Sequence, residues 1–453
     1  MSLSGQPDVI VVGAGAAGLA AAAKLGHAGL AVLILEARNR LGGRMFTKHN
    51  PALPYPIELG AEFIHGMPPE IWQPLQQAKV KIIEVSGQSW CVENGRICAC
   101  DFFDEVDEIL KKMDDRSPDE SFLAFLNRCC PKASDAAKQR TLGYVVGFNA
   151  ADPALVGVHW LLQGMRAEES IEGDRAFRAE GGYAQLVEIL RRQLSPSVSV
   201  KTETLVNSIR WRHGEAELTA KSKEGGMTFK SGRILITVPL GVLKAKAGQV
   251  GAIEFSPALP SSKIDALNRV EMGKVTRVIL RFRERFWETI SPPDHPRKTL
   301  SDMSFLFSKD DWFPTWWTTM PDKLPLITGW APFHSAERFS DRDQDFVVER
   351  SLQTLARLLG MNKQALQDYF EAAYFHDWQK DPFSRGAYSY GKVGADAAQH
   401  ALAEPVAHTL FFAGEATDVT GNNGTVHGAI ASGYRAAAQI LQKINYPATA
   451  IGT

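Results

Sequence analysis

Residues 8–44 read DVIVVGAGAAGLAAAAKLGHAGLAVLILEARNRLGGR, and this stretch decides the fold. The segment from Asp8 to Val12 is dominated by β-branched residues, as is typical of a strand buried on both faces of a sheet. It ends in the order G-x-G-x-x-G at residues 13–18, and residues 19–25 then indicate an Ala-rich helix. A second strand, residues 31–35, ends at Glu36. The stretch therefore predicts one βαβ unit of about 30 residues.

Each glycine of this motif has its own physical role. Gly13 makes a tight turn, Gly15 lets the backbone approach a pyrophosphate, and Gly18 lets helix and strand pack closely. The phosphates are expected beside Ala16 and Ala17, because free N–H groups and the helix dipole favour anions at a helix N-terminus.

A second set of candidate nucleotide-binding residues follows the second strand. Glu36 stands where a carboxylate accepts hydrogen bonds from a ribose diol and repels the extra phosphate of NADP. A further glycine pair with Arg44 would add donors for a diphosphate, which nicotinamide enzymes do not usually need. The pattern therefore favours FAD. The candidates are Glu36, Ala37, Arg38, Gly42, Gly43 and Arg44.

The composition fits an ordinary folded protein. At 453 residues the chain suits two or three packed units. A hydrophobic fraction of 45% and a charged fraction of 22% exclude a disordered or fibrous chain. The formal net charge of −1 gives no field that would draw the chain onto nucleic acid or anionic lipid.

Cysteine usage and hydropathy bear on the compartment. The five cysteines are odd in number and lack the paired C-x-x-C spacing of a zinc site, so we predict no metal site and expect reduced thiols in a cytoplasmic protein. No window of about 18 apolar residues is present, and no basic region with a cleavage site opens the chain, so neither a membrane span nor export is expected. The oligomeric state stays open. The cysteines are Cys91, Cys98, Cys100, Cys129 and Cys130.

The run from Glu36 to Arg44 resembles the signature of the flavin-containing amine oxidase superfamily. This superfamily includes monoamine oxidases, polyamine oxidases, L-amino-acid oxidases and lysine-specific histone demethylases. The sequence ELGAEFIHG at residues 58–66 is similar to the family's loop beside the flavin ring, and His65 is the variant met in polyamine oxidases. The resemblance implies a substrate-site role for His65, although a structural histidine is the alternative. It places Leu59, Gly60, Ala61 and Glu62 at the cofactor.

The resemblance continues through the middle of the chain. Residues 178–183, RAEGGY, are similar to the family's return from the substrate domain, and Val206 would then hold the adenine through its main chain. In the strand MGKVTRVILRF, residues 272–282, alternation directs Lys274 to one face and Arg277 to the other. The resemblance implies that Lys274 reaches a water bonded to flavin N5, where a positive charge stabilises developing superoxide. A surface lysine is the alternative.

Two later motifs complete the expected flavin site. In WQKDPFSRGAY, residues 378–388, Trp378 is expected at the cofactor and Tyr388 matches an aromatic that faces the flavin. Ala387 stands where monoamine oxidases carry the cysteine that bonds to FAD, so we predict a non-covalent cofactor. After residues 410–412, Gly414 and Glu415 match the family's ribityl contact.

The last helix separates branches of the superfamily. It opens at Thr425 and Val426, and its N-terminus would face the flavin pyrimidine carbonyl. Monoamine oxidases place a second tyrosine at the position of Thr425, so the sequence here favours the polyamine oxidase and histone demethylase branch. An acidic patch, with Glu168, Glu169, Glu172 and Asp174, would suit a polycation at the cavity mouth, although a solvated surface is the alternative.

The resemblance predicts an α/β protein with a discontinuous Rossmann-like FAD-binding domain, residues 1–84, 178–262 and 380–453. Residues 85–177 and 263–379 form an inserted α+β substrate domain with an antiparallel sheet. The implied activity is hydride transfer from the carbon beside an amine nitrogen to flavin N5. Dioxygen then reoxidises the flavin to give hydrogen peroxide, and the iminium is hydrolysed to an aldehyde and an amine.

Small-molecule amines of polyamine type and O2 are the expected partners. Four alternatives stay open: a monoamine oxidase, an L-amino-acid oxidase, a desaturase or protoporphyrinogen-type oxidase, and a flavin-binding interaction protein as in the demethylase branch.

Overall fold

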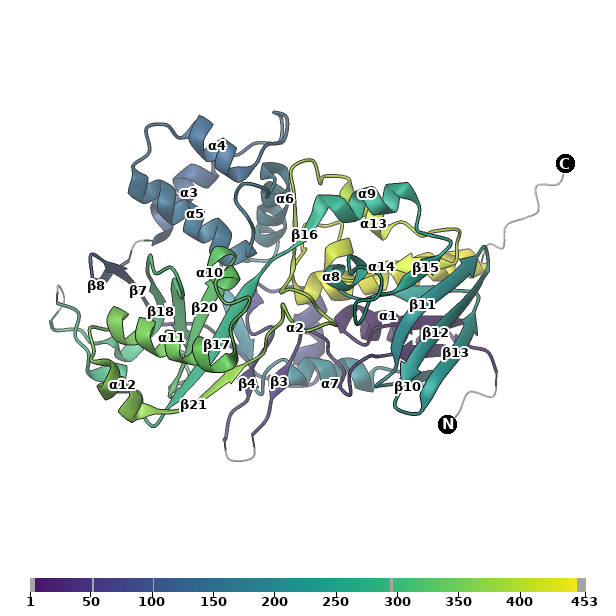
Figure 1. Cartoon of the computed structure of the whole chain (residues 1–453), viewed down its shortest axis with the longest axis horizontal. Coiled ribbons are helices and arrows are strands. Elements are labelled where there is room, and N and C mark those ends of the chain that lie inside the picture. The colour runs from purple at the N-terminus through teal and green to yellow at the C-terminus, as the bar shows by residue number, and fades with distance from the viewer. Residues whose placement is uncertain (1–4, 51–52, 101, 294–295, 446–453) are drawn as a thin grey trace.

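The computed structural model describes residues 5–50, 53–100, 102–293 and 296–445. Two bodies lie side by side, one around a parallel sheet and the other around a larger mixed sheet (Figure 1). Among the described residues, no helix combines the length and the hydropathy needed to cross a membrane.

The parallel sheet contains the two strands that the sequence predicts at residues 8–12 and 31–35. Its order is β10 (Val198–Lys201), β2 (Val32–Leu35), β1 (Val9–Val12), β14 (Ile234–Ile236) and β23 (Leu410–Phe412), and every neighbouring pair is parallel. In β1, Val9 and Val11 pack on one face while Ile10 and Val12 pack on the other. The uninterrupted apolar run is explained by burial on both faces.

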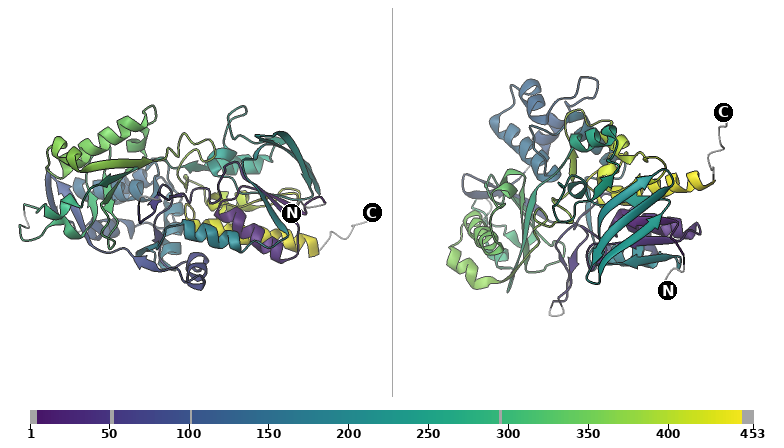
Figure 2. Two further views of the ribbon diagram at one scale, coloured as in Figure 1. Left: turned by 90° about the horizontal axis from the view of Figure 1, so that it is seen from below. Right: turned by 45° about the vertical axis from the view of Figure 1, so that its right-hand side comes forward.

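Different layers cover the two faces of this sheet (Figure 2). On one face, helices α1 (Ala16–His27), α14 (Val426–Asn445), α7 (Ala184–Arg192) and α2 (Pro69–Gln77) share a core with β1. The other face packs against a four-stranded sheet, in the order β13 (Gly225–Ser231), β12 (Glu215–Ser222), β11 (Leu205–Arg212) and β15 (Glu254–Ser256).

The second body contains a seven-stranded sheet. Its order is β21 (Phe370–Phe375), β17 (Val275–Phe282), β20 (Leu326–Pro332), β19 (Thr315–Thr318), β18 (Met303–Phe307), β7 (Gln88–Glu93) and β8 (Arg96–Ala99). The β18–β7 pair is parallel and the other pairs are antiparallel. Helices α11 (Gln344–Leu358) and α12 (Lys363–Tyr369) share its core, in which Trp287 and Trp316 are fully buried.

A helical layer and several short elements complete the chain. The helices α3 (Phe102–Leu110), α4 (Phe122–Cys129), α5 (Asp135–Asn149) and α6 (Val158–Glu169) lie together above the large sheet (Figure 1). The short strands are β3 (Thr47–Lys48), β4 (Ile57–Glu58), β5 (Ile64–His65), β6 (Ile82–Glu84), β9 (Ala176–Ala179), β16 (Val270–Met272) and β22 (Ser389–Gly391). The short helices are α8 (Leu240–Leu243), α9 (Ser261–Arg269), α10 (His334–Glu337), α13 (Ala398–Ala403) and the 3₁₀ turns Phe286–Thr289, Leu300–Asp302 and Glu415–Thr417.

The predicted fold class is confirmed, since a βαβ unit opens a parallel sheet and a mostly antiparallel sheet forms the second body. The residue boundaries between the two domains stay a prediction. Strand β16 pairs with β22, and helix α9 packs against α13. Residues 263–272, expected in the substrate domain, thus contact residues of the FAD-binding domain.

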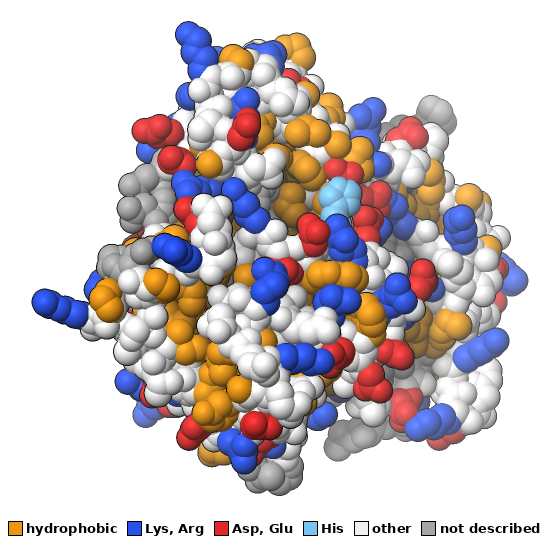
Figure 3. Space-filling model, turned by 60° about the vertical axis from the view of Figure 1, so that its left-hand side comes forward, with side chains coloured by type: hydrophobic (Ala, Val, Ile, Leu, Met, Phe, Trp, Pro, Cys, Tyr) orange, Lys and Arg blue, Asp and Glu red, His pale blue; other side chains and the backbone are white. Residues whose placement is uncertain are grey.

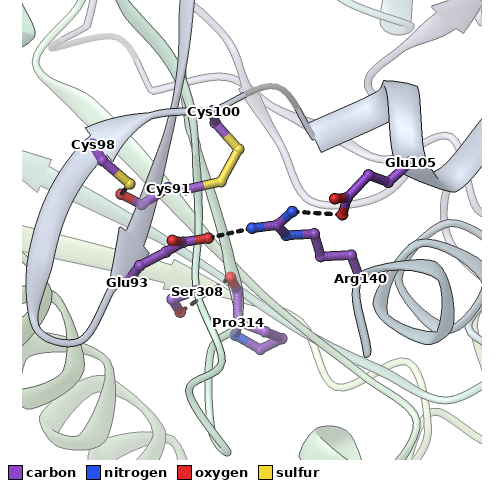
Figure 4. The surroundings of a disulfide bond; sticks show 8 residues. All are labelled: Cys91, Glu93, Cys98, Cys100, Glu105, Arg140, Ser308 and Pro314. Atoms are coloured by element: carbon purple, nitrogen blue, oxygen red, sulfur yellow. Dashed lines mark hydrogen bonds and ion pairs between the residues drawn. A yellow bond between two sulfur atoms is a disulfide. The ribbon is translucent and has the colours of Figure 1, made fainter. Parts of the chain in front are cut away.

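The expectation of reduced cysteines is wrong for one pair. Cys91 on β7 and Cys100 just beyond β8 form a disulfide with their Cα atoms 5.1 Å apart (Figure 4). The hairpin brings them together, because Cys91 pairs across the strands with Cys98, two residues before Cys100. Close by, Arg140 of α5 bridges to Glu93 of β7.

Charged side chains of both signs share the face of the molecule that Figure 3 draws. On the face drawn in Figure 3, basic and acidic side chains are interspersed, in keeping with the net charge of −1.

Candidate functional site

A cavity of about 1320 Å³ is lined by residues of both bodies. At one end lie the glycine turn after β1 and the residues that follow β2. At the other end lie aromatic side chains of the large sheet and of the helical layer. One continuous space therefore joins the nucleotide motif to the second body.

The three glycines of the first turn differ in geometry as their expected roles require. Gly13 has φ +107°, a backbone conformation that favours glycine. A Cβ on Gly15 would meet nothing within 4 Å, so this position opens onto the cavity. A Cβ on Gly18 would lie 2.0 Å from the carbonyl oxygen of Gly13, which explains the close packing of helix and turn.

Helix α1 presents free backbone donors to the cavity. Its N-cap is Gly15, which supplies no side-chain hydrogen bond, and Ala16 and Ala17 line the cavity. Glu36 lies beside this turn and is buried. Its carboxylate accepts hydrogen bonds from the backbone N–H of Ala14 at 2.7 Å and of Arg38 at 2.8 Å. The motif is held by its own hydrogen bonds in an anion-binding arrangement.

A buried carboxylate organises the middle of the cavity. Glu415 receives hydrogen bonds from Arg44 at 2.8 Å, from the hydroxyl of Ser389 at 2.6 Å and from the N–H of Gly424 at 3.0 Å. Arg44 also donates to the carbonyl oxygen of Ala387 at 2.8 Å. The glycine-pair segment after β2 is thereby tied to the 387–389 segment and to the turn before α14.

The N-terminus of α14 points at the same space. The hydroxyl of Thr425 accepts a hydrogen bond from the N–H of Gly428 at 3.0 Å and donates to the carbonyl of Asn422 at 2.6 Å. Both Thr425 and Val426 line the cavity. The positive end of a 20-residue helix is therefore available to a group with partial negative charge.

Aromatic rings form the wall beyond this point. The Tyr388 hydroxyl donates to the carbonyl of Phe148 at 2.7 Å. The Phe148 ring packs edge-on against His65, with centroids 5.1 Å apart, and stacks on Tyr144 at 5.8 Å. Burial lowers the pKa of His65 to about 4, so its ring is neutral at pH 7.

Three charged residues form a buried cluster in the cavity wall. Glu62 receives hydrogen bonds from Arg178 at 2.7 Å, from Arg277, and from the indole of Trp317 at 3.1 Å. Burial alone would raise the pKa of the Glu62 carboxyl, but Arg178 and Arg277 outweigh that effect and lower it. Two guanidinium groups share one carboxylate, which leaves a net positive charge.

Lys274 lies outside the set of residues that line the cavity. Its ammonium group binds Glu337 at 2.7 Å, and its side chain is 47% exposed. Among the described residues, those that line the cavity include Arg277, which is 7% exposed, but not Lys274. The structure thus does not bring Lys274 to the cavity as expected: Lys274 directly precedes β17 and its side chain turns outward, whereas the side chain of Arg277 within β17 turns inward.

The other expected site residues come together in this cavity. Gly18 lies beneath the turn, and His65, Tyr388 and Thr425 line the wall. The expected cofactor residues that line it are Gly13, Gly15, Ala16, Ala17, Glu36, Ala37, Arg38, Gly42, Gly43, Arg44, Leu59, Gly60, Ala61, Glu62, Val206, Trp378, Gly414, Glu415, Thr425 and Val426. Sequence reasoning missed Phe148 and the inward role of Arg277. The only signal for Arg277 was its odd spacing from Lys274.

Comparisons with known proteins bear on this site. The profile of a family described as "Flavin containing amine oxidoreductase" matches residues 105–441. The chain belongs to the flavin-containing amine oxidoreductase family. A profile described as "NAD(P)-binding Rossmann-like domain" matches residues 11–78. The resemblance stated from the motifs is confirmed, and the cofactor of the family, FAD, fits the open Gly15 turn and the free N-terminus of α1.

The chain covers different shares of the length of two curated relatives. "Lysine-specific histone demethylase 1 homolog 2" of Oryza sativa subsp. japonica is 31% identical over 460 residues, which cover 96% of this chain and 57% of that protein. "Polyamine oxidase 2" of Arabidopsis thaliana is 26% identical over 469 residues, which cover 97% of this chain and 89% of that protein. The chain thus spans little more than half the length of this demethylase homologue, and 30% of the length of "Lysine-specific histone demethylase 1 homolog 3" of Arabidopsis thaliana.

Solved structures share the fold. Wild-type putrescine oxidase bound to putrescine superposes with a TM-score of 0.78 at 21% identity, covering 96% of this chain and 99% of that one. Cyclohexylamine oxidase from Brevibacterium oxydans IH-35A superposes with a TM-score of 0.77 at 20% identity, covering 97% of this chain and 100% of that one. The arrangement of the two bodies is therefore common to this chain and to these oxidases.

Proposed function

We propose that this chain is an FAD-dependent amine oxidase that acts on the carbon beside an amine nitrogen and favours substrates of polyamine type. The single observation that carries the proposal is the continuity of the cavity, which joins the nucleotide turn at Gly15 to the aromatic wall at Tyr388. A nucleotide fold with an attached dry pocket is what a flavin oxidase requires.

When bound, FAD supplies the two-electron acceptor for the C–H bond and passes the electrons to dioxygen, which gives hydrogen peroxide. The protein supplies position and electrostatics. Its candidate cofactor contacts are the N–H groups of Ala16 and Ala17, the Glu36 carboxylate and the N-terminus of α14. Glu415 holds the surrounding segments in register.

The aromatic wall orients an amine and keeps water away. The hydroxyl of Tyr388 is fixed by Phe148, so the ring has one orientation. Ring faces hold an amine through dispersion and, where it is protonated, through cation–π attraction. His65, neutral at pH 7, can accept a hydrogen bond from an ammonium group or donate one to a neutral amine.

The buried cluster supplies a fixed positive charge. Because the guanidinium of Arg277 stays protonated, it stabilises negative charge that develops in the cavity but does not relay a proton. Glu62 and Trp317 hold Arg277 in place. We assign to Arg277 the electrostatic role that the sequence assigned to Lys274.

Thr425 supports polyamines over aryl monoamines as substrates. A second tyrosine at this position would complete an aromatic cage for a small amine, and threonine leaves that side open. The relative named polyamine oxidase supports the same class. The demethylase homologues favour a second candidate, an N-methylated lysine side chain presented by a peptide.

A peroxide-release screen on FAD-loaded protein tests the proposal. The panel contains di- and polyamines, alkyl and aryl monoamines, L-amino acids and N-methyl-lysine peptides. We expect peroxide with the polyamines first. Anaerobic bleaching of the flavin absorbance by the same amines identifies the reducing substrate without relying on dioxygen. The proposal would be refuted if no amine of the panel bleached the flavin and none gave peroxide.

A further inference from the structure

A carboxylate that lines the cavity has no partner among the residues that the structure describes. Glu168 is near the C-terminal end of α6 (Val158–Glu169), is partly buried, and lines the cavity. Among the described residues, none gives its carboxylate a hydrogen bond or an ion pair. Burial raises the pKa of Glu168 to about 7. A carboxylate in such surroundings gains by meeting a cation.

Three other acidic side chains nearby are already paired. Glu84 and Glu172 both bind Arg175, at 2.7 and 2.8 Å. Glu93 binds Arg140 at 2.6 Å. Glu168 therefore differs from these neighbours in having its charge available to a ligand.

Aromatic rings connect Glu168 to the wall at Tyr388. Tyr388 holds the backbone of Phe148, the Phe148 ring stacks on Tyr144, and Glu168 raises the pKa of the Tyr144 hydroxyl by its charge, as a secondary contribution to burial. Phe148 is 37% exposed although it lies between two other rings, because its free surface faces the cavity. Helix α5 carries Tyr144 and Phe148, helix α6 carries Glu168, and the two helices share the core of the helical layer.

We propose that Glu168 binds a second ammonium group of the substrate while the first amine lies at Tyr388. The methylene chain between the two nitrogens would then lie along Phe148 and Tyr144. This inference rests on the proposed amine oxidase function and deepens it, because it makes a dication separated by an apolar spacer the preferred substrate. Desolvated ammonium–carboxylate pairs supply affinity when the carboxylate lacks a competing partner.

Matched pairs of amines test the assignment. Linear α,ω-diamines of four to twelve carbons are compared with n-alkylamines of the same length, on FAD-loaded protein at pH 8.5, where the Glu168 carboxyl is ionised. We expect at least one diamine to have a KM about 30-fold below that of its monoamine, which corresponds to about 2 kcal/mol. In Glu168→Gln this ratio should fall below about 3-fold, because the KM of the diamine rises toward that of the monoamine.

Glu169→Gln is the matched control, because Glu169 is the next residue of the same helix and also borders the cavity, but its side chain is exposed to solvent. It should keep the wild-type ratio. Binding of the same amines to the oxidised holoprotein, followed by calorimetry, provides a readout that does not depend on turnover. Diamine binding that weakens only in Glu168→Gln supports the anchor even if no amine is oxidised, in which case the proposed function alone fails. Equal diamine preference in Glu168→Gln and wild type overturns the anchor, and so does the absence of a preference in wild type.

Discussion

Arg277 of β17 donates a hydrogen bond to the carboxylate of Glu62, and the two side chains are only 7% and 8% exposed. The bond connects a strand of the large sheet to the loop between β4 and β5, and Arg277 also donates to the carbonyl of Gly60 at 2.6 Å. Arg178 from β9 binds the other oxygen of the Glu62 carboxylate. This cluster fixes the cavity wall where the two bodies meet.

The contributions of Arg277 and Glu62 to the stability of the protein should be strongly coupled to each other. Arg277→Met leaves Glu62 with one cation, and we expect the free energy of unfolding to fall by about 3 kcal/mol. Glu62→Gln leaves two buried guanidinium groups and should also destabilise. The double variant should lose less than the sum of the single losses, by about 2 kcal/mol. Urea unfolding of all four proteins at pH 7 measures the coupling; additivity within about 0.5 kcal/mol would contradict it.

The reaction with oxygen should depend on Arg277 and not on Lys274. Because Lys274 is paired with Glu337 outside the cavity, Lys274→Met should leave the rate of flavin reoxidation within about twofold of wild type. Arg277→Met removes the buried charge and should lower that rate about 100-fold. Arg277→Lys keeps a positive charge, so its rate of reoxidation should lie between those of Arg277→Met and wild type. Stopped-flow mixing of reduced protein with oxygenated buffer gives the rates. A large loss in Lys274→Met alone would reverse the assignment.

The nucleotide turn and the pair Lys274 and Arg277 show which parts of the site can be predicted from the sequence. The nucleotide turn was predictable, because its glycines, helix and acidic residue act within about 30 consecutive residues. Alternation also correctly separated Lys274 from Arg277. Which face meets the cavity depends on pairing with β20 and on the distant loop at Glu62, and neither is visible in the strand itself. The cluster with Arg178 is formed by residues more than 90 positions apart and leaves no local pattern.

Acid should destabilise the protein through its buried histidines. Burial lowers the pKa of His427 to about 4 from 6.5, and nearby His65 adds to this effect. Between these values the unfolded chain binds more protons than the folded one, so the free energy of unfolding falls as pH decreases from 6.5 toward 4. His427→Gln should reduce the loss between pH 7 and pH 5, measured by urea unfolding. The exposed His49 provides the control, and His49→Gln should change the pH dependence little. An equal effect of the two variants would exclude His427 as the source.

The flavin should leave the protein on denaturation. Ala387 offers no thiol at the position where monoamine oxidases attach FAD. Of the described residues that line the cavity, the one cysteine is Cys91, whose sulfur is bonded to Cys100. After acid precipitation, we expect all of the flavin in the supernatant, and no fluorescent protein band on a denaturing gel. Flavin retained by the washed pellet would show a covalent bond that this arrangement does not account for.

Two glycines of the first turn should separate cofactor binding from folding. At Gly15 the backbone has φ −77° and a Cβ would meet no protein atom within 4 Å, so Gly15→Ala should leave the stability of the apoprotein unchanged. The new methyl group points into the space that a pyrophosphate would occupy, so FAD affinity should fall at least about 10-fold, because backbone donors can no longer approach the phosphates. Gly18→Ala instead places a carbon 2.0 Å from the Gly13 carbonyl and should destabilise the apoprotein itself. Flavin titration and thermal unfolding of the apoproteins distinguish the two effects. If Gly15→Ala bound FAD as tightly as wild type, the pyrophosphate would not approach this turn, and the position assigned to the cofactor would have to be revised.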